Sequence, residues 1–190
     1  MQSILAAAKS VLLEKDYTQF SLRNIAAGAG IHLANLQYYF PSKTAIIHAL
    51  VDHVVQEYES RYRTRFASLP EKPHPRFVAM LDFLIEDIRD PQTRRFFVQL
   101  WALLESSDTS GRAVLLNELY AHHIAVIAGY VGELSPRLSP GVRQQRAAMI
   151  AAMIDGMMLM LLDADALREP GAPDIGIEMR RQLLRIATDA

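Results

Sequence analysis

Residues 33–40 place small, amide and aromatic side chains where they could contact a polyanion. On a helix that turns about 100° per residue, Leu36 and Phe40 share one face and must form its core side. The opposite face holds Ala34 and Tyr38, is flanked by Asn35 and Gln37, and carries no acidic residue. Asparagine and glutamine amides can bond the donor–acceptor edge of adenine, tyrosine can reach phosphates or base methyls, and alanine permits close approach. The pattern therefore predicts a helix whose outer face binds nucleic acid.

Two further short helices would hold this helix in position. An apolar stripe at helical spacing predicts the first of them, which ends near residues 16–18: Ile4, Leu5, Ala8, Val11 and Leu12. Ser21 is the expected N-cap of the second helix, whose inward-facing residues are Leu22, Ile25 and Ala26. A tight turn over residues 28–31 then leads into the third helix. Two short helices joined by a glycine-containing turn are the outline of a helix-turn-helix.

A cation follows this motif directly. Pro41 ends the third helix, Ser42 starts the next one, and Lys43 could hold a phosphate together with that helix N-terminus. Residues 1–46 contain four basic and two acidic residues, a net charge of +2, so residues 47–190 carry −3 if the whole chain is −1. A locally positive head on a mildly acidic body fits a chain that contacts DNA at one end.

The remainder of the chain shows only helical patterns. Pro- and Gly-containing segments separate six stretches without apolar–polar alternation, which we expect to be helices: 43–67, 75–89, 92–105, 112–133, 140–165 and 174–188. The predicted fold class is therefore all-α. Its domains are a three-helix helix-turn-helix head over residues 1–46 and a six-helix body over residues 47–190.

Composition and motifs exclude several other classes of protein. The chain has no Cys, which excludes disulfides, thiolate nucleophiles and Cys-ligated metals, and 51% hydrophobic residues are enough to bury a core. The N-terminus lacks the features of a secretory signal, and Asp155 interrupts an apolar run over 147–162 that is too short for a membrane span. We therefore expect a cytoplasmic protein without membrane contact. No phosphate-binding loop, nucleophile elbow or zinc-protease motif is present, so we expect no enzyme, no metal and no cofactor.

The stretches SLRNIAAGAGI (21–31) and LQYYFPSK (36–43) resemble the DNA-binding head of the TetR family of bacterial transcriptional regulators. The resemblance covers about the first fifty residues, and the turn, the aromatic pair and the trailing lysine all fall at the family's spacing. It implies that Ser21 and Arg23 touch the DNA backbone and that His32 stands at the cap of the recognition helix, where the family often has Ser or Thr. The base-reading positions that it implies are Leu33, Asn35 and Tyr38, and the phosphate-holding positions are Gln37, Tyr39 and Lys43.

The resemblance also implies a function and partners. Members of the family are regulators, mostly repressors, that bind a palindromic operator on double-stranded DNA as homodimers and are released by a small-molecule effector. Their last two helices pair across the dimer, which corresponds here to 140–165 and 174–188. The residues agree with this expectation, because the helix 140–165 is apolar all round and must be covered on two sides.

Candidate effector contacts come from polar and apolar side chains of the body. A methionine stripe, Met149, Met153, Met157 and Met160, fits either an adaptable pocket wall or a core and subunit interface. The eight ligand-binding candidates are Phe97, Trp101, Glu105, Tyr120, His123, Met153, Asp155 and Met157. Core packing explains Phe97 and Trp101 equally well, and Asp155 could instead pair with a cation or cap a kink.

Two other functions remain open from the sequence. Glu118 and His122 lie four residues apart on one helix face, a spacing that can ligate a metal, so a helical enzyme or metal-binding protein with a vestigial helix-turn-helix is one alternative. A constitutive DNA-binding protein whose body only dimerises is the other.

Overall fold

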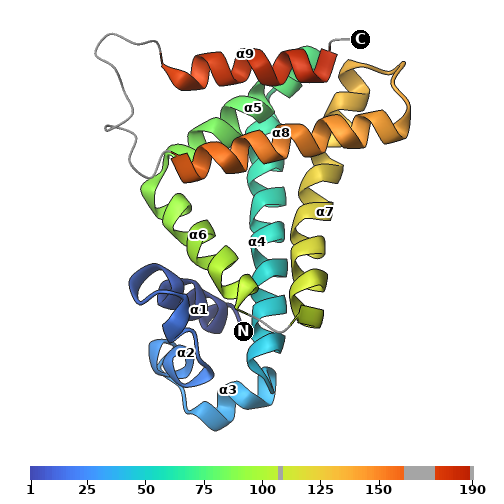
Figure 1. Ribbon diagram of the computed structural model, residues 1–190. Coiled ribbons are helices and arrows are strands. Elements are labelled where there is room, and N and C mark those ends of the chain that lie inside the picture. Colours follow the sequence, from blue (N-terminus) through green and yellow to red (C-terminus); the bar gives the residue numbers. More distant parts are fainter. Residues whose placement is uncertain (107–108, 161–173, 189–190) are drawn as a thin grey trace. The chain divides into compact units, whose positions relative to one another are not determined.

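The computed structural model describes residues 1–106, 109–160 and 174–188, and within these ranges the secondary structure is entirely helical. The head contains α1 (Gln2–Glu14), a 3-10 turn (Tyr17–Gln19), α2 (Leu22–Gly28) and α3 (Leu33–Tyr39) (Figure 1). The remaining helices are α4 (Lys43–Phe66), α5 (Pro73–Arg89), α6 (Pro91–Glu105), α7 (Thr109–Leu134), α8 (Pro140–Met160) and α9 (Ile175–Thr188). The all-α prediction is confirmed, and residues 161–165 of the helix predicted over 140–165 lie outside the described ranges.

The chain divides into two compact units. The first, called here the N-terminal unit, comprises Met1–Ser60 and Arg95–Tyr120, and the second, the C-terminal unit, comprises Arg61–Arg94 and Ala121–Ala190. α4, α6 and α7 therefore each contribute residues to both units. The head shares its unit with the beginning of α4 and with most of α6.

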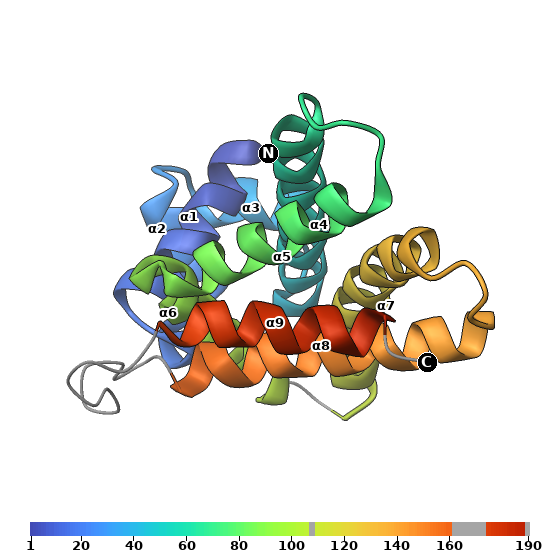
Figure 2. The same ribbon diagram turned by 90° about the horizontal axis from the view of Figure 1, so that it is seen from above.

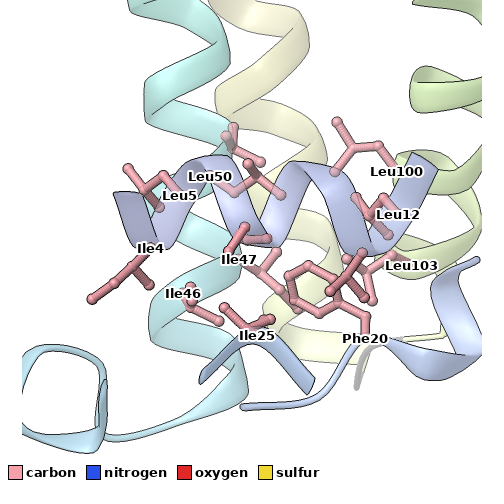
Figure 3. Close-up of a cluster of buried hydrophobic side chains, with 14 of the residues drawn as sticks. Ile4, Leu5, Leu12, Phe20, Ile25, Ile46, Ile47, Leu50, Leu100 and Leu103 are labelled. Carbon is pink, nitrogen blue, oxygen red and sulfur yellow. The ribbon is translucent and has the colours of Figure 1, made fainter. Parts of the chain in front are cut away.

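A single apolar cluster organises the N-terminal unit (Figure 3). The predicted stripe of α1 is buried in this cluster, together with Ile25 of α2 and Leu36 of α3. Ile46, Ile47 and Leu50 from the start of α4 and Leu100 and Leu103 from α6 close it. Each fully buried leucine or isoleucine of this cluster stabilises the unit by about 1.5–3 kcal/mol relative to an exposed position.

Polar contacts connect α1 to α4 and α6 around this core. The Lys9 ammonium donates to Glu57 at 3.0 Å and lies 5.3 Å from the centroid of the Phe96 ring. The backbone N–H of Tyr17 donates to Oε1 of Gln99 at 2.9 Å, which pairs a loop amide of the head with a side chain of α6. The helices of the head are therefore fixed to α4 and α6 by hydrogen bonds as well as by packing.

In the C-terminal unit, α5, α8 and α9 pack against one another, and α9 lies alongside α8 (Figure 2). Arg180 of α9 donates to the carboxylate of Asp82 on α5 at 3.0 Å. Asp87 of α5 is buried and accepts from the Arg61 guanidinium, which also lies 4.7 Å from the Phe83 ring centroid. A buried carboxylate needs such a cation because burying it alone would be costly.

Candidate nucleic-acid interface

Helix α3 is anchored through one face and exposed on the other. Leu36 is fully buried and Phe40 is 6% exposed, so both form the core side predicted for this helix. On the opposite side, Tyr38 is 85% and Tyr39 56% exposed, and their rings pack edge to face at 5.3 Å. Two adjacent exposed aromatic rings form a contiguous apolar surface, and such a surface is typical of an interaction site.

The residues that set the direction of α3 are the cap of α2 and the turn after it. The Ser21 hydroxyl accepts from the backbone N–H of Asn24 at 3.2 Å, as predicted for an N-cap. Gly30 adopts φ +67°, a left-handed conformation that glycine accommodates without strain. The N–H of Ile31 then donates to the carbonyl of Ala26 at 3.0 Å, which closes the turn between α2 and α3.

His32 occupies the N-cap of α3 but makes no side-chain capping hydrogen bond. Its imidazole is exposed. The first backbone N–H groups of α3 therefore lack the side-chain acceptor that Ser, Thr, Asp or Asn would supply. The sequence correctly predicts the position of this residue and the altered cap.

The start of α4 presents a cation beside the motif. The Ser42 hydroxyl accepts from the backbone N–H of Ala45 at 3.1 Å and so caps the helix. Lys43 is the first residue of α4, is exposed, and has its ammonium 5.9 Å from the centroid of the buried Phe20 ring. Positive charge and helix N–H groups at one point favour an anion such as a phosphate.

A hollow of about 460 Å³ lies between the start of α1 and α3. Ser3 and Ile4 of α1, Ile31 of the turn, and Asn35, Tyr38 and Tyr39 of α3 all line it. Ser3 and Ile31 are not among the residues predicted to contact DNA. Only the folded arrangement reveals them, because no periodicity in the sequence places the start of α1 beside α3.

The nine predicted DNA-contacting residues differ in how far their side chains are exposed to solvent. Exposed side chains are those of Arg23, His32, Asn35, Gln37, Tyr38, Tyr39 and Lys43. Ser21 is half-buried because its hydroxyl caps α2. Leu33 is also half-buried and packs against the apolar cluster of the N-terminal unit, so less of it is available to a base edge.

Four of the predicted effector contacts lie in the N-terminal unit. The Phe97 ring packs between Tyr58 and Trp101, with centroid separations of 6.0 Å and 6.3 Å. Within the described residues, the buried indole Nε1 of Trp101 has no hydrogen-bond acceptor. Tyr120 is half-buried, whereas Glu105 is exposed.

The other four predicted effector contacts lie in the C-terminal unit. Burial lowers the pKa of His123 to about 4, with a smaller contribution from the neighbouring charge of His122. Asp155 and Met157 are half-buried, and Met153 is 37% exposed on α8. Over the described residues no group of three or more His, Asp or Glu side chains could hold a metal, and the side chain of Glu118 lies outside the described set.

The geometry defines a class of protein, a helix-turn-helix head on an all-helical body. Residues 4–50 match the family described as "Bacterial regulatory proteins, tetR family". The resemblance of the head to the TetR family, which the sequence predicts, is therefore confirmed over residues 4–50.

Known proteins resemble both the head and the whole chain. The regulator EthR of Mycolicibacterium smegmatis is 34% identical over 71 residues, which are 37% of this chain. The match spans 33% of that relative, so the chain matches about a third of its length. A FadR regulator from Bacillus subtilis, solved with stearoyl-CoA, superposes with a TM-score of 0.71 at 17% identity, covering 99% of this chain and 97% of the other. A TetR-family member from Streptomyces coelicolor gives 0.69 at 19% identity, covering 97% and 96%.

None of the described helices combines the length and the apolar character that a membrane span requires.

Proposed function

We propose that this chain is a ligand-responsive transcriptional regulator that binds operator DNA through α3. The exposed outer face of α3 carries the proposal, because Leu36 and Phe40 fix the opposite face and the amide and aromatic side chains are left to solvent. The match of residues 4–50 to the TetR family supports the same conclusion.

In this proposal each head lays α3 in a major groove. Asn35 and Tyr38 meet base edges, while Arg23 and Lys43 hold phosphates on either side of the motif. The hollow beside Asn35 and Tyr39 gives the DNA strand room next to α1. One head covers too little DNA for high specificity, so two heads reading half-sites about one helical turn apart are required.

We assign the dimer contact to α8 and α9. Met149 and Met160 of α8 are 55% and 57% exposed, and Ile175 and Ile177 of α9 are about half exposed. Ile150 and Ile154 of α8 are buried at the same time, so this helix is apolar on its covered and its uncovered sides. An exposed apolar surface of this kind is typical of a protein–protein interface, and a second copy of the chain is the partner that a palindromic operator demands.

The body is proposed to bind a small amphipathic effector that releases the DNA. Trp101 offers a buried N–H to a ligand oxygen and Phe97 an apolar ring, and an acyl-bearing ligand is found in the similarly folded FadR. The effector acts as an inducer only if it prefers a dimer geometry whose heads no longer fit the operator. Repression is the direction that we propose, because the family that residues 4–50 resemble consists mostly of repressors.

The experiment has two stages. Selection of bound sequences from random duplex DNA, at low and moderate salt, is expected to enrich a palindrome, and sedimentation of the complex is expected to give two chains per duplex. Fluorescence of Trp101, the single tryptophan of the chain, then reports effector binding in a small-molecule screen. A protein that enriches no motif at either salt concentration contradicts the DNA-binding proposal, and one whose DNA affinity no bound ligand changes contradicts the effector proposal.

A further inference from the structure

We propose that α3 reads an A·T base pair in each half-site, with Asn35 on the adenine and Tyr38 against the thymine methyl. This inference rests on the proposed DNA-binding function and deepens it, because it names the base pair that the exposed face of α3 recognises.

The donors and acceptors of α3 select adenine. Asn35 is exposed, and its amide N–H can donate to N7 of adenine while its carbonyl oxygen accepts from the adenine amino group in the major groove. Guanine presents two acceptors there, which the guanidinium of arginine satisfies with paired hydrogen bonds. No Arg or Lys occurs between Arg23 and Lys43, so α3 itself has no such group to offer guanine.

The apolar part of the same face selects thymine. Tyr38 is 85% exposed, and the methyl of Ala34 lies one turn before it on the outer side of α3. Thymine is the only base of the four that presents a methyl group in the major groove. The Tyr39 ring packs edge to face against the Tyr38 ring at 5.3 Å and extends the apolar surface beside it.

Asn35 and Tyr38 lie close enough to act on one base pair. They are three residues apart on α3, which makes them neighbours on the helix surface, and both line the hollow beside α1. Since an A·T pair presents its adenine and its thymine methyl side by side in the major groove, one pair can satisfy both side chains.

The test uses the duplex selected by the wild-type protein, with single-atom changes in the bases. Deoxyuridine replaces each thymine in turn, which removes only the methyl group. 7-Deazaadenine replaces each adenine in turn, which exchanges the N7 acceptor for a C–H group. At one base pair of each half-site we expect the lost methyl to weaken binding about fourfold. We expect the lost N7 to weaken binding about tenfold at the same pair.

Protein variants assign each penalty to a side chain. In Tyr38→Ala, deoxyuridine should no longer weaken binding, whereas 7-deazaadenine should still weaken it. In Asn35→Ala, 7-deazaadenine should no longer weaken binding, whereas deoxyuridine should still weaken it. Gln56→Ala, which removes an exposed amide from α4 at a position not predicted to contact DNA, is the matched control and retains both penalties. Asn35→Arg is expected to change the selected pair from A·T to G·C.

The outcomes separate the two proposals. If the wild-type protein selects no sequence, the DNA-binding function itself is wrong. If it selects a motif whose bases show neither penalty, or whose penalties persist in Asn35→Ala and Tyr38→Ala, the DNA-binding function stands and the A·T readout by α3 is overturned.

Discussion

Removing the charge of Lys43 should reduce the salt dependence of operator binding by a defined amount. The side chain is exposed at the first residue of α4, where the Ser42 cap and the helix N–H groups also favour an anion. Each lysine that neutralises a phosphate releases a counterion, which contributes about 0.9 to the slope of log affinity against log salt concentration. A dimer places two such lysines on a palindrome, so Lys43→Gln should reduce the slope by about 1.8.

This slope converts directly into affinity. On the same relation, Lys43→Gln should bind the operator about 60-fold more weakly than the wild-type protein at about 0.1 M salt, and about ninefold more weakly at about 0.3 M salt. Fluorescence anisotropy of a labelled operator, titrated at four or more salt concentrations, measures both quantities. The variant also loses the contact with the Phe20 ring, which costs about 0.5 kcal/mol of stability, so a thermal melt must show that the head remains folded at the assay temperature.

Lys15→Gln is the matched control. Lys15 is exposed after the end of α1, next to the segment in which Tyr17 bonds Gln99 of α6, and it is not one of the predicted DNA contacts. Both variants have the same net charge, so a long-range effect changes both equally. The reasoning is refuted if Lys43→Gln keeps the wild-type slope, or if Lys15→Gln lowers the slope as much as Lys43→Gln does.

Three further predictions concern the cap of α3, the half-buried His123 and the dimer. His32→Ser supplies the missing N-cap acceptor and should raise the free energy of unfolding of the head by about 1 kcal/mol in denaturant unfolding. An equal or lower free energy of unfolding would show that the missing cap does not destabilise α3. His123 has a pKa of about 4 in the folded chain and near 6.5 when unfolded, so stability is full above pH 6.5 and is lost as the pH falls toward 4. His123→Gln should reduce this loss by about 3 kcal/mol, and an unchanged pH profile would contradict the burial of this imidazole. Met149→Lys should weaken the dimer about 100-fold in sedimentation, because it buries an unpaired charge, while Gln144→Lys on another face of α8 should leave the dimer intact; equal effects would exclude α8 as the interface.

The sequence predicts the helices well because their ends carry strong local signals. Ser21 caps α2 and Ser42 caps α4 through side-chain hydrogen bonds, as their residue types suggest. The core side of α3 follows from helical spacing alone, which places Leu36 and Phe40 together. These features depend on neighbours in the chain, so one sequence is sufficient to find them.

Contacts between distant segments could not be predicted in the same way. Leu100 and Leu103 of α6 belong to the same core as α1, about ninety residues earlier in the chain, and apolar periodicity says only that they are buried. The hydrogen bond from Tyr17 to Gln99 and the hollow between Ser3 and Tyr39 likewise arise only when the helices have packed. Leu33 is a single residue for which the sequence-based prediction is incomplete. It packs against the apolar cluster, which leaves less of its side chain for the base contact expected from the family resemblance.

The central claim is that the exposed face of α3 reads DNA, and a parallel selection tests it most directly. Random duplex DNA is offered to the wild-type protein and to the Asn35→Ala, Tyr38→Ala double variant at the same salt concentration. Both substitutions are at exposed positions, so the variant should keep the fold, which a thermal melt verifies. The account predicts a palindrome from the wild-type protein and loss of that palindrome from the variant. Enrichment of the same palindrome by both proteins would contradict it.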